Sequence, residues 1–114
     1  MLAAGDAEVA AELFGQVLER EEQAEVPAAS RAMTASLLAR SLGSAGEFGQ
    51  AVGAFGYAAD LFGEAEEHAD QAMALTERAK ILARFDEHDD AIESLETASE
   101  IVRKAPEALS LIHI

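Results

Sequence analysis

Carboxylates and three histidines are the side chains in this sequence that could hold a metal or do acid–base chemistry. Their densest group is Asp86, His88, Asp89 and Asp90. Consecutive side chains at a helix start diverge in direction, and aspartate there satisfies free N–H groups and favours the positive end of the helix. We therefore predict a helix start at Asp89 or Asp90 and no metal site. His68 lies among acidic residues typical of a solvated helix face.

Other catalytic and cofactor signatures are missing from the sequence. There is no cysteine, which excludes disulfides, thiolate catalysis and cysteine-ligated metals. A di-iron site needs glutamate three residues before histidine, but Ala65, Phe85 and Ser110 stand there. No glycine loop is followed by Lys-Ser or Lys-Thr, as a phosphate-binding loop requires. We expect neither an enzyme nor a cofactor.

Charge and hydropathy restrict the class of partner. The 114 residues carry a formal net charge of −14, which repels nucleic-acid phosphates and anionic membrane surfaces. No apolar run is long enough to span a bilayer, and Asp6, Glu8 and Glu12 stand where a signal peptide would be positive. We expect a cytoplasmic protein that binds neither nucleic acid nor membrane.

The elements that position these residues are predicted to be helices, because alanine and leucine dominate the apolar residues and the chain has only two prolines, which would interrupt a helix. Apolar residues at three- and four-residue steps predict an all-α fold of about five helices. In the first, the predicted apolar stripe comprises Val9, Ala10, Leu13, Phe14 and Val17. The predicted helices cover residues 6–25, 27–42, 48–62, 65–84 and 89–104, and a sixth begins near Pro106.

An internal repeat runs through these helices. Ala10, Ala51 and Ala91 fall 41 and 40 positions apart, and each is followed four residues later by a large apolar residue. Those residues are Phe14, Phe55 and Leu95, and a smaller one follows three further on, at Val17, Ala58 and Ala98. A fixed period of this length is typical of helical-repeat proteins.

This register resembles the second helix of the tetratricopeptide repeat, in a variant whose period is about 40 residues instead of about 34. The resemblance implies antiparallel helix-turn-helix units stacked as a short right-handed solenoid. It divides the chain into a half repeat (1–25), two repeats (26–64 and 65–105) and the start of a truncated one (106–114). Arg78 departs from the family pattern, standing where an apolar residue is expected. Gly49, Gly53 and Gly56 either let a neighbouring helix approach or weaken their helix.

The resemblance also implies that the first helix of each unit lines a groove. Residues on the predicted groove face of these two helices are Met33, Ser36, Leu37, Arg40, Met73, Thr76, Lys80 and Arg84. Two interpretations remain open. The basic members make the groove locally positive for a peptide bearing carboxylates, with methionines giving adaptable contact, or they are ordinary surface residues paired with Glu77 and its neighbours.

The functional expectation is a scaffold that binds a protein or an acidic peptide, as the interaction or sensor segment of a larger bacterial regulator. The family's clamp for chaperone tails needs asparagine, which this chain lacks. One alternative is an acidic chaperone that holds a secreted client, like those of type III secretion. Another is a structural bundle that self-associates through its uncapped ends.

Overall fold

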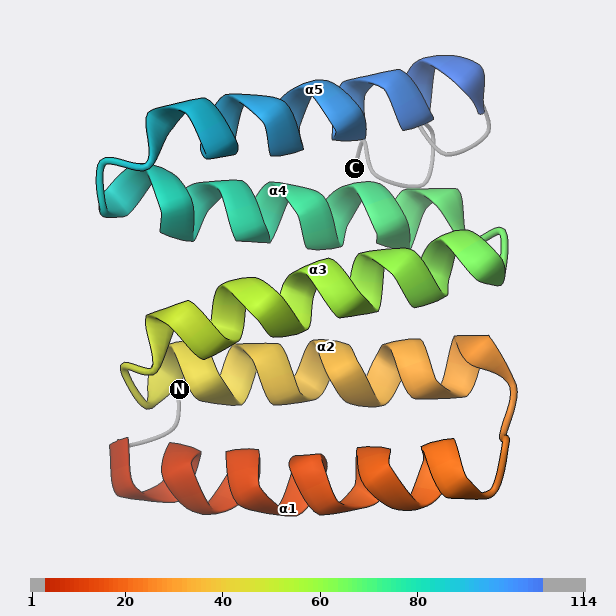
Figure 1. Cartoon of the computed structure of the whole chain (residues 1–114), viewed down its shortest axis with the longest axis vertical. Helices are drawn as coiled ribbons and strands as arrows, with labels where there is room; N and C mark the ends of the chain where they lie inside the picture. Colours follow the sequence, from red (N-terminus) through yellow and green to blue (C-terminus); the bar gives the residue numbers. More distant parts are fainter. Residues whose placement is uncertain (1–3, 106–114) are drawn as a thin grey trace.

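The fold is all-α within the part of the chain that the computed structural model describes, residues 4–105. Five helices follow one another without a strand among these residues: α1 (Ala4–Gln23), α2 (Ala28–Ser44), α3 (Phe48–Glu64), α4 (His68–Arg84) and α5 (His88–Lys104). Each helix packs against the next along the chain, in antiparallel succession (Figure 1). The prediction of an all-α chain with five helices is confirmed.

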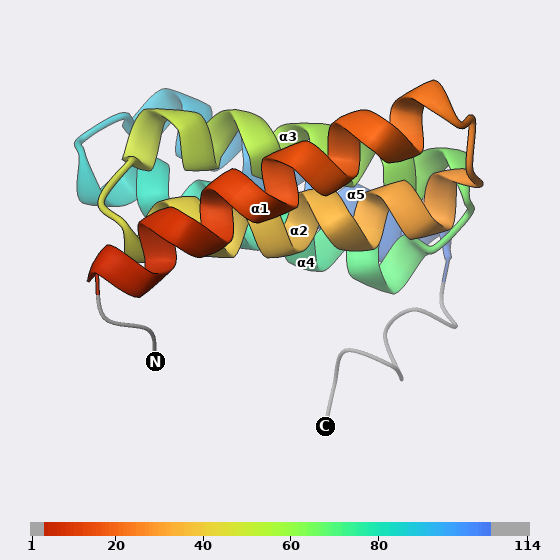
Figure 2. The ribbon, with the colours of Figure 1, turned by 90° about the horizontal axis from the view of Figure 1, so that it is seen from below.

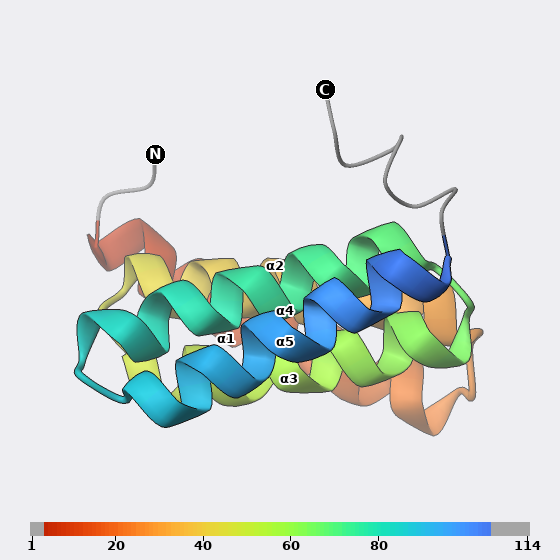
Figure 3. The same ribbon diagram turned by 90° about the horizontal axis from the view of Figure 1, so that it is seen from above.

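The stack has two sides. Seen from its two opposite ends, α2 and α4 lie together on one side and α3 lies on the other (Figures 2 and 3). Helices α1 and α5 cross obliquely at the two ends of the stack, so each packs mainly on one other helix while α3 packs on both α2 and α4. No helix in the described range has the length and apolar character that crossing a membrane requires.

Three of the loops share one geometry. Helices α2 to α5 are each 17 residues long and begin at 28, 48, 68 and 88, so helix and loop together repeat every 20 residues. The middle loop residue has positive φ in each case: Gly46 (84°), Glu66 (57°) and Asp86 (60°). The following N–H donates back to the carbonyl of Leu42, Phe62 or Leu82 at 2.9 Å. This is a Schellman motif, which satisfies free carbonyls at a helix end.

Two predicted helix starts are wrong, and the Schellman loops explain both. The fourth helix begins at His68 and not at 65, because left-handed Glu66 cannot continue a helix. The fifth begins at His88, so Asp89 and Asp90 lie in its first turn and do not cap it. Asp6 likewise lies inside the first turn of α1, where its charge still favours the positive end of the helix. The predicted start of a sixth helix at Pro106 lies outside the described residues.

The core is centred on α3 and is made largely of alanine. Phe55, Leu61 and Phe62 pack with Leu18 of α1, Ala74 of α4 and the buried alanines of α2 and α3, which are Ala32, Ala35, Ala39, Ala58 and Ala59. Small side chains at these positions let the helix axes approach closely. The predicted apolar stripe of α1 is not its buried face: Val9, Leu13 and Val17 are exposed, and Ala10 and Phe14 are only half-buried. The buried residues of α1 are Ala7, Ala11 and Leu18, which lie outside that stripe. That stripe lies on the side of α1 with no helix beside it.

The contact between α3 and α4 explains two of the glycines of α3 and the arginine at position 78. A Cβ on Gly56 would lie 3.6 Å from Nε of Arg78, and one on Gly63 would lie 2.6 Å from Nε2 of Gln71. These two glycines therefore admit polar side chains of α4, while Gly49 and Gly53 have no neighbour within 4 Å. Arg78 replaces the expected apolar residue because it crosses between helices and donates to the hydroxyl of Ser94 on α5.

Candidate peptide-binding surface

A hollow of about 360 Å³, which we name the inner groove, lies between α2 and α4 with α3 beneath it. Five of the eight predicted binding residues line it: Met33, Ser36, Leu37 and Arg40 of α2, and Met73 of α4. Phe55 and Phe62 of α3 and Asp70, Ala74 and Glu77 of α4 complete the lining. The structure thus brings together most of the residues that the repeat pattern placed on the groove face.

Large apolar side chains are exposed along the inner groove. Met33 and Met73 are 56% and 46% exposed, and Leu37, which lines the same hollow, is 39% exposed. An unbranched methionine adapts its shape to a partner at little cost. The groove therefore offers adaptable apolar contact flanked by polar side chains.

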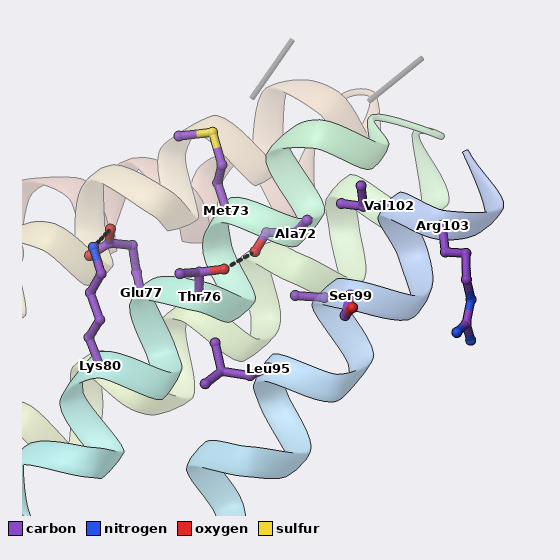
Figure 4. A pocket seen from close by; sticks show the side chains of 10 residues that line it. Ala72, Met73, Thr76, Glu77, Lys80, Leu95, Ser99, Val102 and Arg103 are labelled. Carbon is purple, nitrogen blue, oxygen red and sulfur yellow. Dashed lines mark hydrogen bonds and ion pairs between the residues drawn. The ribbon is translucent and has the colours of Figure 1, made fainter. Parts of the chain in front are cut away.

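A second hollow of about 670 Å³, which we name the end groove, lies between α4 and α5 (Figure 4). Its α4 wall contains the predicted residues Met73, Thr76 and Lys80 together with Ala72 and Glu77. Its α5 wall consists of Leu95, Ala98, Ser99, Val102 and Arg103. Figure 4 shows Leu95 directed toward α4 and Arg103 directed away from the hollow. The two grooves share Met73 and Glu77 of α4, so they are neighbouring hollows.

Arg84 lies apart from the other predicted residues. Its guanidinium carbon is 5.9 Å from the centroid of the Phe48 ring, and that ring lies 4.9 Å from the ring of Phe85. Arg84 lines neither groove. Its cation is instead part of an aromatic cluster beside the loop that joins α4 to α5.

The two cations that line the grooves from α2 and α4, Arg40 and Lys80, differ in their pairing. Nζ of Lys80 lies 3.1 Å from Oε1 of Glu77, which agrees with the second interpretation of that lysine as a surface ion pair. Arg40 makes no ion pair within residues 4–105, although Asp70 lines the same hollow. Arg40 is therefore the cation of the inner groove best placed to meet an incoming carboxylate.

The sequence interpretation missed the groove floor. Phe55, Phe62, Leu95 and Val102 line the two hollows, but the repeat register assigned the odd-numbered helices only to the outer side and the core. The signal that could have found them is the 40-residue offset, which pairs Phe55 with Leu95 and Phe62 with Val102. A side chain that is core in one repeat becomes groove wall in the next.

The histidine and carboxylate side chains of the described residues were compared with the arrangement that a metal ion needs. Over residues 4–105, no three histidine, aspartate or glutamate side chains converge as metal ligands would. His88 Nε2 lies 3.4 Å from Asp86 Oδ1, and both side chains are well exposed to solvent.

One titratable group of the described helices does have a shifted pKa. The hydroxyl of Tyr57 on α3 donates to the Glu22 carboxylate on α1, and this hydrogen bond, with partial burial, raises the pKa of the phenol. The pair joins the first and third helices.

Comparison with known proteins found no match: no protein-family model, no curated protein and no solved structure matches this chain.

Proposed function

We propose that this protein is a tetratricopeptide-like scaffold that binds a protein or peptide in the inner groove. The observation that carries the proposal is the set of exposed apolar side chains, Met33, Leu37 and Met73, in a hollow between two helices on one side of the stack. Exposed apolar surface beside polar residues is typical of protein-interaction sites. The 40-residue register and the helix-loop-helix units are consistent with that family.

The partner is expected to contribute apolar side chains first and charge second. Lys80 is already paired with Glu77, so it offers little free charge, and Arg40 is the residue we assign to a partner's carboxylate. Apolar side chains of an extended or helical peptide would enter beside Met33 and Leu37, over the ring of Phe55.

Selection from a displayed library of random peptides tests the proposal. Enriched peptides should bind the Met33→Glu/Leu37→Glu double variant at least about tenfold more weakly, because two carboxylates then line the apolar wall. Both side chains are exposed, so this variant should keep its fold, which circular dichroism verifies. Arg84→Glu is the matched control and should leave binding unchanged, since Arg84 lies outside both grooves.

Two outcomes would contradict this function. One is a selection that enriches no peptide above the empty support. The other is enriched peptides that bind the double variant as tightly as the unmodified protein, which would place their site elsewhere.

A further inference from the structure

Helix α5 has the same place in its repeat as α3, but its outer side is uncovered. The 40-residue offset puts Leu95 where α3 has Phe55, and Phe55 packs in the core cluster that includes Ala74 of α4. Phe55 is 4% exposed, whereas Leu95 is 47% exposed. Within the described residues nothing lies on α5 as α4 lies on α3, and the end groove occupies that position (Figures 1 and 4). The packing of α4 on α3 is therefore the template for the end groove, and it indicates that a helix fits there.

The edge of α5 beside the end groove carries a negative charge that the matching edge of α3 lacks. On α3, Gly56 faces the side chain of Arg78, and the equivalent residue on α5 is Glu96. A helix lying on α5 in the same way would bring its counterpart of Arg78 against that carboxylate. Asp89 and Glu93 continue the exposed acidic edge toward the start of α5, and none of the three acids forms an ion pair within residues 4–105.

We propose that the end groove binds an amphipathic α-helix of another protein, with apolar side chains in the groove and lysine or arginine along the acidic edge of α5. Met73, Leu95 and Val102 would contact the apolar side of that helix. At least one basic residue would take the position that Arg78 has over α3 and pair with Glu96. This site does not depend on the inner groove being a peptide site, although the two hollows share Met73 and Glu77.

Charge argues against a second copy of the chain as the occupant. The exposed stripe of α1 in a second copy is accompanied by exposed Asp6, Glu8 and Glu12, and each copy carries a net charge of −14, so acidic surfaces would meet. Residues 106–114 contain no lysine or arginine that could pair with the acidic edge. A basic helix from a partner brings the opposite charge to that edge.

The test uses a labelled peptide of residues 68–84, stapled in helical form on its solvent side, because α4 is the template for the occupant. Fluorescence anisotropy measures its binding to the full chain. The charge-reversed protein Glu96→Arg should bind it about five- to tenfold more weakly, since an attraction becomes a repulsion. The Arg78→Glu peptide should show the opposite preference and bind the Glu96→Arg protein better than the unmodified protein. Methyl NMR shifts should appear at Ile92, Leu95 and Val102.

Several results would overturn the proposal. Binding that is indifferent to both charge reversals, or shifts confined to Met33 and Leu37, would place the peptide outside the end groove. A dimer in light scattering that Leu95→Glu separates would assign the groove to a second copy. A rise in peptide affinity of tenfold or more on Leu111→Glu would assign it to the chain's own last residues. Because Met33→Glu/Leu37→Glu alters only the inner groove, failure of one site is distinguishable from failure of the other.

Discussion

Helices α3 and α5 are equivalent in backbone and in register, yet they are used differently. Both are 17 residues long and both follow a Schellman loop. α3 is covered on two sides and carries phenylalanine and glycine on its α4 side, where α5 carries Leu95, Val102, Glu96 and Arg103. The difference indicates that the repeat specifies where a helix lies, while its neighbours and the residues on its outer side decide whether that side is buried or exposed.

Truncation of the two equivalent large residues should distinguish α3 from α5 most strongly. Phe55→Ala should lower the free energy of unfolding by about 3–5 kcal/mol, because it leaves a cavity in the central cluster. Leu95→Ala should cost about 1 kcal/mol or less, since its side chain is half exposed. Urea unfolding followed by circular dichroism measures both. Equal losses would mean that the outer side of α5 is covered in solution.

Arg78 of α4 contacts both of the helices compared, since it lies beside Gly56 of α3 and donates to Ser94 of α5. Arg78→Met should lower the free energy of unfolding by about 1–3 kcal/mol, since the buried Ser94 hydroxyl loses its partner. Ser94→Ala in the same background should recover part of that loss, because no buried polar atom is then left unsatisfied. If the double variant instead costs the sum of the two single changes, the hydrogen bond does not contribute as the geometry indicates.

A smaller effect separates the two edges. Gly56→Ala should raise the free energy of unfolding by up to about 1 kcal/mol, because alanine favours helix and its Cβ would make an ordinary contact with Arg78. Glu96→Ala on α5 should change it by no more than about 0.5 kcal/mol. Gly53→Ala, with no neighbour within 4 Å, is the control for helix propensity alone. A loss of stability for Gly56→Ala but not Gly53→Ala would show that α4 needs the glycine.

The smallest effect concerns the far side of the two helices, where α3 has Tyr57 and α5 has Thr97. Tyr57 donates to Glu22 of α1, whereas Thr97 bonds to the carbonyl of Glu93 on its own helix. Because the folded-state pKa of Tyr57 is raised, its stabilisation is complete below the unfolded phenol pKa of about 10 and is lost as pH rises through the folded value. The stability of Tyr57→Phe relative to the parent should therefore improve only above about pH 10 in urea unfolding, whereas Thr97→Val should show no such pH dependence.

The helices and the repeat could be predicted because spacing alone decides them. Apolar residues at helical steps and the Ala10, Ala51, Ala91 register gave the five helices and their order. Loop geometry could not be predicted, since Glu66 and Asp86 adopt positive φ at positions without glycine. The apolar pattern therefore predicts the start of the fourth helix at residue 65, three residues before its actual start at His68.

The groove was predicted in part, for a similar reason. Periodicity placed Met33, Leu37 and Met73 on one side of the stack, but the side chains that cross between helices depend on tertiary packing. Lys80 forms an ion pair with Glu77, and the guanidinium of Arg84 lies over the ring of Phe48. The exposure of Val9 and Leu95 depends on which neighbours a helix has, which no single-helix pattern contains.

The 20-residue step of helix and loop makes the chain divisible in units of two helices. Removing residues 46–85 would join Ala45 to Asp86, which has the same left-handed geometry as the Gly46 that it replaces. Helix α5 would then follow α2 in the direction that α3 has now, and the two sides of the stack would be preserved. Removing one helix and one loop would instead reverse the direction of every helix after the cut. The architecture therefore accommodates changes of length in steps of 40 residues, and each such step adds or removes one inner groove while the surroundings of α5 stay the same.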